Sequence, residues 1–430
     1  MNFDYSVSYI LGYFNLIFIP IYCFWRFKKD DFLIFLNPLF YLLFASYFYL
    51  TISSVLFDNF INYQLSFKPI LGKITESDIA ITNLLCNWTV LVFLFFYSLS
   101  KNWYVFYSID YKPRKKTYQF ALFFLGISAL IYLLVIIIYG SDLFNSSRRE
   151  ALEFYADLFA RFRLENFTTL LLVSSTVLVW RFKESRWYLF LLLPIVFGML
   201  AKDRDLLFQG GIFSYINLVI LNRKTYFVLL LLGLVILLLF GLINDFSLEG
   251  NILTGQSLYN VLGEFFNTRV TTIIVYKNYL GYGNLIDYLK ESLLTILPST
   301  IQTSILDNSI LDYHLEIKNY YNSIGINFGL AGNIVSEALF YGGTTFAIIS
   351  PFIIALIFYI LNLLRIYRLF PGFIFLCLLL AKFYVIMRSS FYDNFLEIFY
   401  LMFSYLIWLT WLEKNKIFLK SKYPRKYNLK

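Results

Sequence analysis

The stretch FALFFLGISALIYLLVIIIY, residues 120–139, contains no ionisable group other than tyrosine. An apolar run of about 20 residues is long enough to cross the hydrocarbon core of a bilayer as an α-helix. A strand of a membrane barrel would alternate apolar and polar residues, whereas residues 229–240 are apolar on every face except for one glycine. The sequence therefore predicts membrane-spanning helices, because only helices and closed barrels satisfy their backbone groups inside a bilayer.

Similar apolar runs recur along the whole chain of 430 residues, of which 59% are hydrophobic and only 15% are charged. Soluble domains average about 25% charged residues, so this is the composition of a membrane protein. We predict an all-α, polytopic bundle of about eleven transmembrane helices, forming a single integral membrane domain over residues 1–430. The predicted spans are 5–25, 32–57, 79–100, 119–139, 167–180, 187–201, 206–221, 226–243, 344–364, 371–388 and 392–412.

The net charge of +9 comes from lysines and arginines between the apolar runs. We interpret them as topology signals and not as a nucleic-acid-binding surface. Short cytoplasmic loops are enriched in these residues, so the N-terminus is predicted to lie outside the cytoplasm and the C-terminus inside. The basic segments contain Arg26, Lys28, Lys29; Lys101, Lys112, Arg114, Lys115, Lys116; Arg181, Lys183, Arg186; Arg223, Lys224; Arg365, Arg368; and seven lysines and arginines of the tail from Lys414 to Lys430.

One predicted outer loop is much longer than the others and covers residues 244–343, roughly 100 residues. Connections of this length are usually functional. Apolar residues recur at helical spacing between Leu258 and Phe266, and again between Leu285 and Leu297, where Pro298 ends the pattern. We predict amphipathic helices that lie on the membrane surface or cap the bundle.

Arginines are unusually frequent on the predicted outer side, where the positive-inside rule predicts few of them. Charged groups at membrane depth are costly and often mark functional sites, and the planar guanidinium suits phosphate. These arginines predict a site for a phosphorylated, lipid-anchored substrate at the outer leaflet. The alternative is interfacial anchoring, or pairing with acidic residues of the 140–166 loop. The arginines are Arg148, Arg149, Arg161, Arg163, Arg204, Arg269 and Arg388.

Two residues are candidate general bases. Glu337 lies among apolar residues just before the ninth predicted span, and His314 is the only histidine of the chain; both side-chain types transfer protons in enzymes. The alternatives are an ion pair of Glu337 with an arginine and an ordinary surface histidine. A single histidine predicts no zinc site. Asp203 and Asp205 have a spacing that holds metal in some glycosyltransferases, but pairing with the adjacent basic residues is the preferred interpretation, so no metal or cofactor is predicted.

Five segments resemble the O-antigen polymerases, the Wzy-type oligosaccharide repeat-unit polymerases of bacterial surface polysaccharide assembly. They cluster between about residues 199 and 345, and the likeness in architecture covers most of the chain. The segments are Met-Leu-Ala-Lys-Asp-Arg-Asp at 199–205, Phe-Asn-Thr-Arg-Val at 266–270, Tyr-Leu-Gly-Tyr-Gly-Asn-Leu-Ile-Asp-Tyr-Leu at 279–289, Ser-Leu-Leu-Thr-Ile-Leu-Pro-Ser-Thr-Ile at 292–301, and Asn-Ile-Val-Ser-Glu-Ala-Leu-Phe-Tyr-Gly-Gly at 333–343.

The resemblance implies a GT-C-like membrane fold in the bacterial inner membrane and a metal-independent glycosyltransferase. Its substrate would be an undecaprenyl-diphosphate-linked oligosaccharide on the extracytoplasmic face, with a chain-length regulator as a further partner. The growing glycan would leave its lipid diphosphate and join a new repeat unit. In that reaction Glu337 or His314 would act as the base. The diphosphate would be bound by Arg148, Arg149, Arg204, Arg269 and Arg388.

Three other functions compete with the polymerase. A flippase for lipid-linked oligosaccharides would have two repeat halves and short loops, and the sequence shows neither. An O-antigen ligase would share the arginines and the long loop but use a different acceptor. A receptor or structural membrane protein would not need arginines at the outer membrane face.

Overall fold

The computed structural model describes the chain in separate stretches. They are residues 3–30, 37–56, 74–100, 113–146, 154, 164–182, 184–201, 206–207, 209–214, 255–284, 286, 313–324, 332–363, 378–380 and 387. Every secondary-structure element in these stretches is helical, which confirms the predicted all-α class. The elements are α1 (Phe3–Asp30), α2 (Pro38–Ser46), the π-helix η2 (Tyr47–Ile52), α3 (Ser53–Val55), α6 (Glu76–Leu99), α7 (Lys115–Asn145), α9 (Leu164–Phe182), the 3-10 helix η5 (Ser185–Leu191), α10 (Leu192–Leu200), α13 (Gly255–Asn278), α16 (Tyr313–Ser323) and α17 (Ile334–Leu363).

Five of the described helical segments are long and apolar enough to cross a membrane, and they coincide with the first four predicted spans and the ninth. Two shorter apolar helices match the predicted fifth and sixth spans. Half of the predicted span 206–221 is described, and the other three predicted spans lie wholly or largely outside the described residues, so a total of about eleven remains a prediction. The five segments are Ser6–Lys29, Pro38–Val55, Glu76–Leu99, Lys115–Asn145 and Ile334–Leu363, and the shorter helices are Phe167–Phe182 and Leu189–Leu200.

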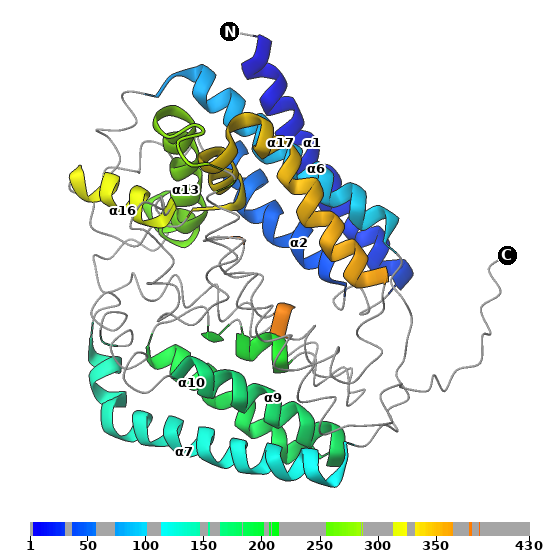
Figure 1. Ribbon diagram of the computed structural model, residues 1–430, viewed down its shortest axis with the longest axis vertical. Coiled ribbons are helices and arrows are strands. Elements are labelled where there is room, and N and C mark those ends of the chain that lie inside the picture. The colour runs from blue at the N-terminus through cyan, green and yellow to red at the C-terminus, as the bar shows by residue number, and fades with distance from the viewer. Residues whose placement is uncertain are drawn as a thin grey trace, which may run out of the picture. The chain divides into compact units, whose positions relative to one another are not determined.

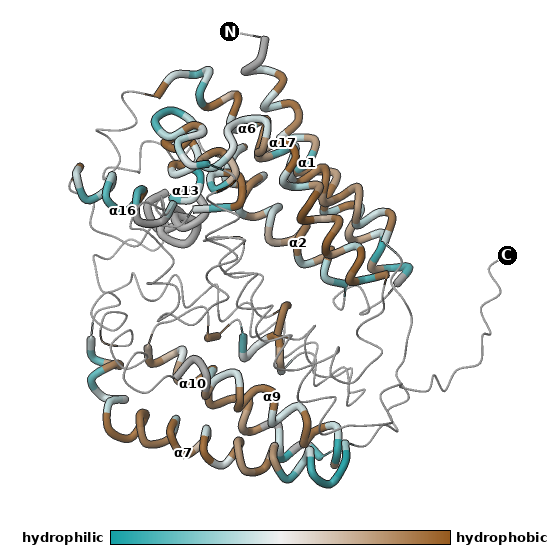
Figure 2. The backbone as a smooth tube through the Cα atoms, viewed as in Figure 1, coloured by the Kyte–Doolittle hydropathy of each residue, from teal (hydrophilic) through white to brown (hydrophobic). Residues whose placement is uncertain are grey.

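The long helices are apolar along most of their length (Figure 2). Many of their large apolar side chains are exposed, including Ile10 of α1 and Ile137 of α7. In water this exposure would be unfavourable, but hydrocarbon tails are as apolar as these side chains. The exposed faces are therefore suited to contact lipid, which supports a membrane location.

The chain folds into two compact units, and the prediction of one integral membrane domain remains a prediction. The first unit comprises residues 1–103, 248–365 and 383–400, and the second comprises residues 104–247, 366–382 and 401–430. In the second unit, α7 and α9 are antiparallel, because Tyr118 near the start of α7 stacks edge-on against Phe182 at the end of α9. Further along, the hydroxyls of Tyr132 and Thr168 form a hydrogen bond.

In the first unit, α1 packs along α6 and runs in the same direction (Figure 1). In the middle of both helices, the Asn15 side-chain amide donates to the backbone oxygen of Asn87 at 3.1 Å. At their ends, the Arg26 guanidinium donates to the backbone oxygen of Ser100 at 2.9 Å. Asn37, which precedes α2, donates to the hydroxyl of the same serine at 2.8 Å, so α2 starts where α1 and α6 end and runs back.

Helix α17 packs on α6 and is parallel to it. The Trp88 indole donates to the backbone oxygen of Ile348 at 3.2 Å, and further along the rings of Phe96 and Tyr359 meet edge-on at 5.8 Å. Two spans of one chain run in the same direction only if an odd number of crossings separates them. The five spans predicted between the third and the ninth satisfy this condition.

Candidate functional site

The arginine of the predicted outer loop, Arg269, lies on α13 and contacts α6. Arg269 is completely buried. Its Nη2 donates to the backbone oxygen of Ile79 at 3.1 Å, to Thr82 Oγ1 at 2.6 Å and to Asn83 Oδ1 at 2.5 Å. A buried cation is tolerated only where hydrogen bonds replace its lost hydration, and bonds from a charged donor are the strong ones. In this conformation Arg269 fastens α13 to α6, and its predicted contact with a diphosphate remains a prediction.

The Asn333 side chain links α13 to the beginning of α17. Asn333 Nδ2 donates to Thr272 Oγ1 at 2.8 Å and to the backbone oxygen of Thr268 at 3.3 Å. Asn333 Oδ1 accepts from the backbone N–H groups of Val335 and Ser336, both at 3.0 Å. The side chain thereby caps the N-terminus of α17, where backbone donors have no partner within the helix. Because both ends of this amide are used, Asn333 fixes α17 relative to α13.

Glu337 lies in the first turn of α17, and its side chain is only 3% exposed. Its backbone N–H donates to the oxygen of Asn333 at 3.0 Å. The partial positive charge of a helix N-terminus stabilises a carboxylate in the first turn. The predicted base is therefore held in a buried position at the end of a candidate membrane span.

The start of α16 lies against this turn of α17. Tyr313 Oη is 2.7 Å from Ser336 Oγ, and the Tyr313 backbone N–H donates to Tyr341 Oη at 3.1 Å. Burial raises the pKa of Tyr313 above its ordinary value, and the charge of Glu337 raises it further. The Tyr313 phenol therefore stays protonated at neutral pH, so it can act as a hydrogen-bond donor near Glu337 but not as a base.

The loop after α13 is docked into a kink of α17. Gly343 has φ 63° and ψ −160°, a conformation that is essentially restricted to glycine. In a regular helix the oxygens of Leu339 and Phe340 would accept from residues 343 and 344. Here they accept from the N–H groups of Gly281 and Gly283, both at 2.9 Å. The kink therefore leaves two carbonyl oxygens without partners inside the helix, and backbone N–H groups of the loop bond to them.

Glycine is also required at position 283 for reasons of space. A Cβ there would come within 2.6 Å of Tyr341 Cδ1 and within 3.0 Å of the Phe340 ring. The loop can approach α17 closely only without a side chain at this position.

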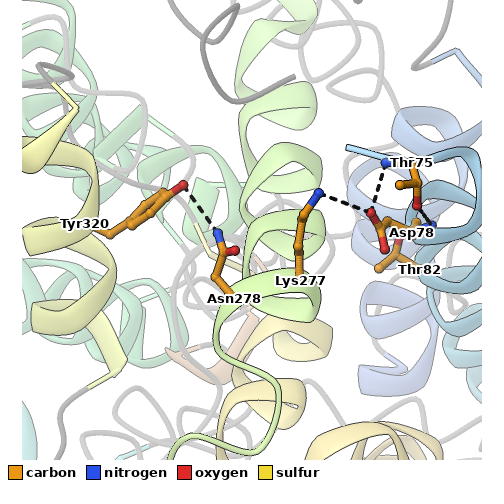
Figure 3. Close-up of polar contacts among 6 residues, drawn as sticks. All are labelled: Thr75, Asp78, Thr82, Lys277, Asn278 and Tyr320. Carbon is orange, nitrogen blue, oxygen red and sulfur yellow. Dashed lines mark hydrogen bonds and ion pairs between the residues drawn. The ribbon is translucent and has the colours of Figure 1, made fainter. Parts of the chain in front are cut away.

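The last turn of α13 makes polar contacts on two sides (Figure 3). Lys277 Nζ is 3.7 Å from Asp78 Oδ2 on α6, and on the opposite side Asn278 Nδ2 donates to Tyr320 Oη of α16 at 3.3 Å. Asp78 also forms a capping box with Thr75 at the start of α6, because each side chain accepts from the other's backbone N–H. α13 therefore links the beginning of α6 to α16.

Three of the five segments on which the predicted resemblance is based meet, in their described parts, at this junction. They are residues 266–270 on α13, 279–284 in the docked loop, and 333–343 at the start of α17. The sequence identified Arg269 and Glu337 but not Asn333, Thr272 or Tyr313. A sequence signal exists only for Asn333, since asparagine directly before an apolar helical run is a typical N-cap.

The other predicted site residues are less fully described. The backbone of His314 is helical, in the first turn of α16, and its side chain lies outside the described part. The remaining arginines also lie outside the described residues, so the structure does not test whether they approach Glu337. These are Arg148, Arg149, Arg161, Arg163, Arg204 and Arg388. Among the described residues, no three His, Cys, Asp or Glu side chains are grouped in a way that could hold a metal ion.

Comparisons of the chain with protein-family models, with curated proteins and with solved structures found no match in any of the three. The site combines a buried carboxylate, a buried guanidinium and several hydroxyl and amide groups at the end of a bundle of apolar helices.

Proposed function

We propose that this protein is a membrane glycosyltransferase that takes a glycan from a polyprenyl diphosphate on the outer face of the membrane. The more specific proposal is an O-antigen polymerase acting on undecaprenyl-diphosphate-linked repeat units in the bacterial inner membrane. The observation that carries it is the buried Glu337, in the first turn of a candidate membrane-spanning helix. The segment that contains it, residues 333–343, forms hydrogen bonds with the segments at 266–270 and 279–284. Buried carboxylates at membrane edges are costly and commonly serve chemistry.

In the proposed reaction an acceptor sugar hydroxyl attacks the anomeric carbon of the donor. The new glycosidic C–O bond forms as the bond from that carbon to the diphosphate breaks. The hydroxyl proton passes to the carboxylate of Glu337, which acts as general base, and the bonding electrons leave with the lipid diphosphate. Glu337 suits this role because its buried surroundings exclude competing water.

The leaving diphosphate gains negative charge, which preorganised cations stabilise. The candidates for direct contact are Arg148, Arg149, Arg204 and Arg388. Arg269 is better suited to positioning, because its Nη2 group already holds three oxygen atoms of α6. It would keep α13, and through Asn333 the first turn of α17, in place.

The test is to reconstitute the purified protein in lipid nanodiscs with the host's own lipid-linked repeat unit and to separate the glycan products by size. A polymerase produces a ladder of repeat units. Glu337→Gln, which keeps the shape but not the basicity, is expected to reduce the ladder at least about a hundredfold, the usual contribution of a general base. Glu76→Gln, at the exposed start of α6, is the matched control and should leave it unchanged.

Full ladder formation by a folded Glu337→Gln variant would remove Glu337 from the mechanism. No coupling by the wild type would exclude the polymerase. Transfer of preformed polymer to a different lipid acceptor would identify a ligase. Movement of the lipid-linked unit across the membrane without coupling would identify a flippase.

A further inference from the structure

Two segments with similar sequences meet at the ends of α13 and α16. Residues 277–284 read Lys-Asn-Tyr-Leu-Gly-Tyr-Gly-Asn, and residues 318–323 read Lys-Asn-Tyr-Tyr-Asn-Ser. The rings of Tyr279 and Tyr320 meet edge-on at 5.8 Å. Asn278 Nδ2 donates to Tyr320 Oη at 3.3 Å (Figure 3). The two segments therefore form one continuous surface, which we call the tyrosine–asparagine platform and define as Asn278, Tyr279, Tyr282 and Tyr320.

The platform offers aromatic rings together with amide and hydroxyl groups. The Tyr282 side chain is 53% exposed, and Asn278 is exposed as well. Further exposed amides lie next to it in the same two segments, on Asn284 and Asn319. A tyrosine ring has an apolar face and a polar edge, and an amide has both donors and acceptors. This is the chemistry that recognises a sugar, whose ring has apolar C–H faces and a rim of hydroxyl groups.

Tyr282 is held in place by its neighbours although its side chain is exposed. The backbone on both sides of Tyr282 is held by the hydrogen bonds of Gly281 and Gly283 to α17. The Tyr282 ring also packs edge-on against Tyr279 at 5.5 Å and lies 5.9 Å from the Phe340 ring. A side chain that is already fixed loses little conformational freedom when a ligand binds. Tyr282 is therefore preorganised for contact with a partner.

The charges around the platform favour a neutral partner. The Lys277 ammonium points toward Asp78 on α6, away from Tyr320 (Figure 3). On α16, the described side chains Lys318 and Glu316 carry opposite charges, which add up to zero. Burial and, to a smaller extent, the charge of Glu316 raise the pKa of Tyr279, so its phenol is also neutral. An anionic lipid headgroup or a phosphate would gain little from such a surface.

We propose that the tyrosine–asparagine platform binds the oligosaccharide portion of the substrate, with Tyr282 stacking on a sugar ring and Asn278 and Tyr320 contacting its hydroxyl groups. This deepens the proposed function and rests on it only for the identity of the glycan. The docked loop connects the platform directly to α17, which carries Glu337. A glycan seated on the platform would thus contact a loop that is hydrogen-bonded to the helix that carries the proposed base.

The experiment measures binding and not turnover. The probe is the oligosaccharide repeat unit of the host's own polysaccharide, released from its lipid and free of phosphate, added to the full chain in nanodiscs. Wild-type protein is expected to bind the oligosaccharide. Tyr282→Ala is expected to weaken binding at least about tenfold, because one stacking contact is lost. Tyr282→Phe keeps the ring and is expected to bind within about twofold of wild type. Leu280→Ala removes an apolar side chain of the same loop that is also exposed, and this variant should bind like wild type.

Inorganic diphosphate is the competitor and is expected not to displace the oligosaccharide. Unchanged affinity in Tyr282→Ala, or displacement by diphosphate, would overturn the proposal. So would equal losses in Tyr282→Ala and Leu280→Ala, which would mark the loop as a membrane-surface anchor. Tyr282-dependent binding without any product ladder would support the platform and refute the polymerase. A product ladder without Tyr282-dependent binding would support the polymerase and refute the platform.

Discussion

At the scale of single residues, a substitution of Arg269 distinguishes a structural role of this side chain from a substrate-binding role. Arg269→Met keeps much of the side-chain volume but leaves Thr82 Oγ1 and Asn83 Oδ1 of α6 without this donor. We expect the free energy of unfolding to fall by about 1.5–3 kcal/mol, the usual worth of hydrogen bonds from a charged donor. The measurement is the thermal unfolding of the purified variant in detergent.

The control for that variant is Lys277→Met on the same helix. Its ion pair with Asp78 is longer, at 3.7 Å, and part-exposed, so less than about 1 kcal/mol should be lost. If Arg269→Met unfolds like wild type but loses coupling activity, the residue contacts the substrate and the structural interpretation is wrong.

Residue types alone identified the charged members of the site but not their polar partners. An arginine and a glutamate in apolar surroundings stand out in any sequence. The hydrogen-bonded pairs Thr272–Asn333 and Arg269–Asn83 cannot be recognised in the sequence. Their members lie 61 and 186 residues apart, and local periodicity does not predict contacts over such separations. The sequence signal at Asn333 is that of a helix N-cap and does not indicate its contact with Thr272.

At the scale of elements, the kink at Gly343 positions the loop that carries Tyr282. Gly343→Ala places a side chain in a conformation that only glycine tolerates well, at a cost of about 1–3 kcal/mol. We expect α17 to straighten, the oxygens of Leu339 and Phe340 to return to the helix, and residues 279–284 to be released. Limited proteolysis of this loop, combined with thermal unfolding, measures both effects.

Gly126→Ala serves as the comparison for this helix variant. Gly126 lies inside α7, and a Cβ there would meet nothing within 4 Å. Alanine is the better helix former, so the variant should be as stable as wild type or more stable. A Gly343→Ala protein as stable and as protease-resistant as the Gly126→Ala protein would show that the kink does not need glycine.

The periodicity between Leu258 and Phe266 predicted a helix, and α13 confirms it. Its environment could not be inferred from the same pattern. Residues 268–275 are all buried, although half of them are threonine or arginine, and polar residues on a helix normally indicate a solvated face. They are buried here because α6, α16 and the start of α17 supply their hydrogen-bond partners. Hydrogen-bond partners also allow α17 to begin at Ile334, ten residues before residue 344, where the span was predicted to begin.

At the scale of the whole molecule, the direction of the helices links the site to one side of the membrane. α1, α6 and α17 run in parallel, and the ends of α1 and α6 meet through Arg26 and Ser100. The last turn of α1 carries Lys28 and Lys29, and positive charge of this kind marks the cytoplasmic side. Glu337, at the opposite end of α17, would then lie on the outer side, as the proposed glycosyltransferase requires.

Cysteine labelling of intact cells tests this orientation. A membrane-impermeant maleimide is expected to label Tyr282→Cys directly but Lys29→Cys only after the membrane is permeabilised, because both side chains are exposed at opposite ends of the first unit. Cys23 and Cys86 lie within the candidate spans, so the parent protein controls for their background. A reporter fused after Lys430 should report the cytoplasm. The reverse labelling pattern would place Glu337 and Arg269 on the cytoplasmic side, where an extracytoplasmic donor could not reach them. The proposed glycosyltransferase would then be excluded, whatever the chemistry of its site.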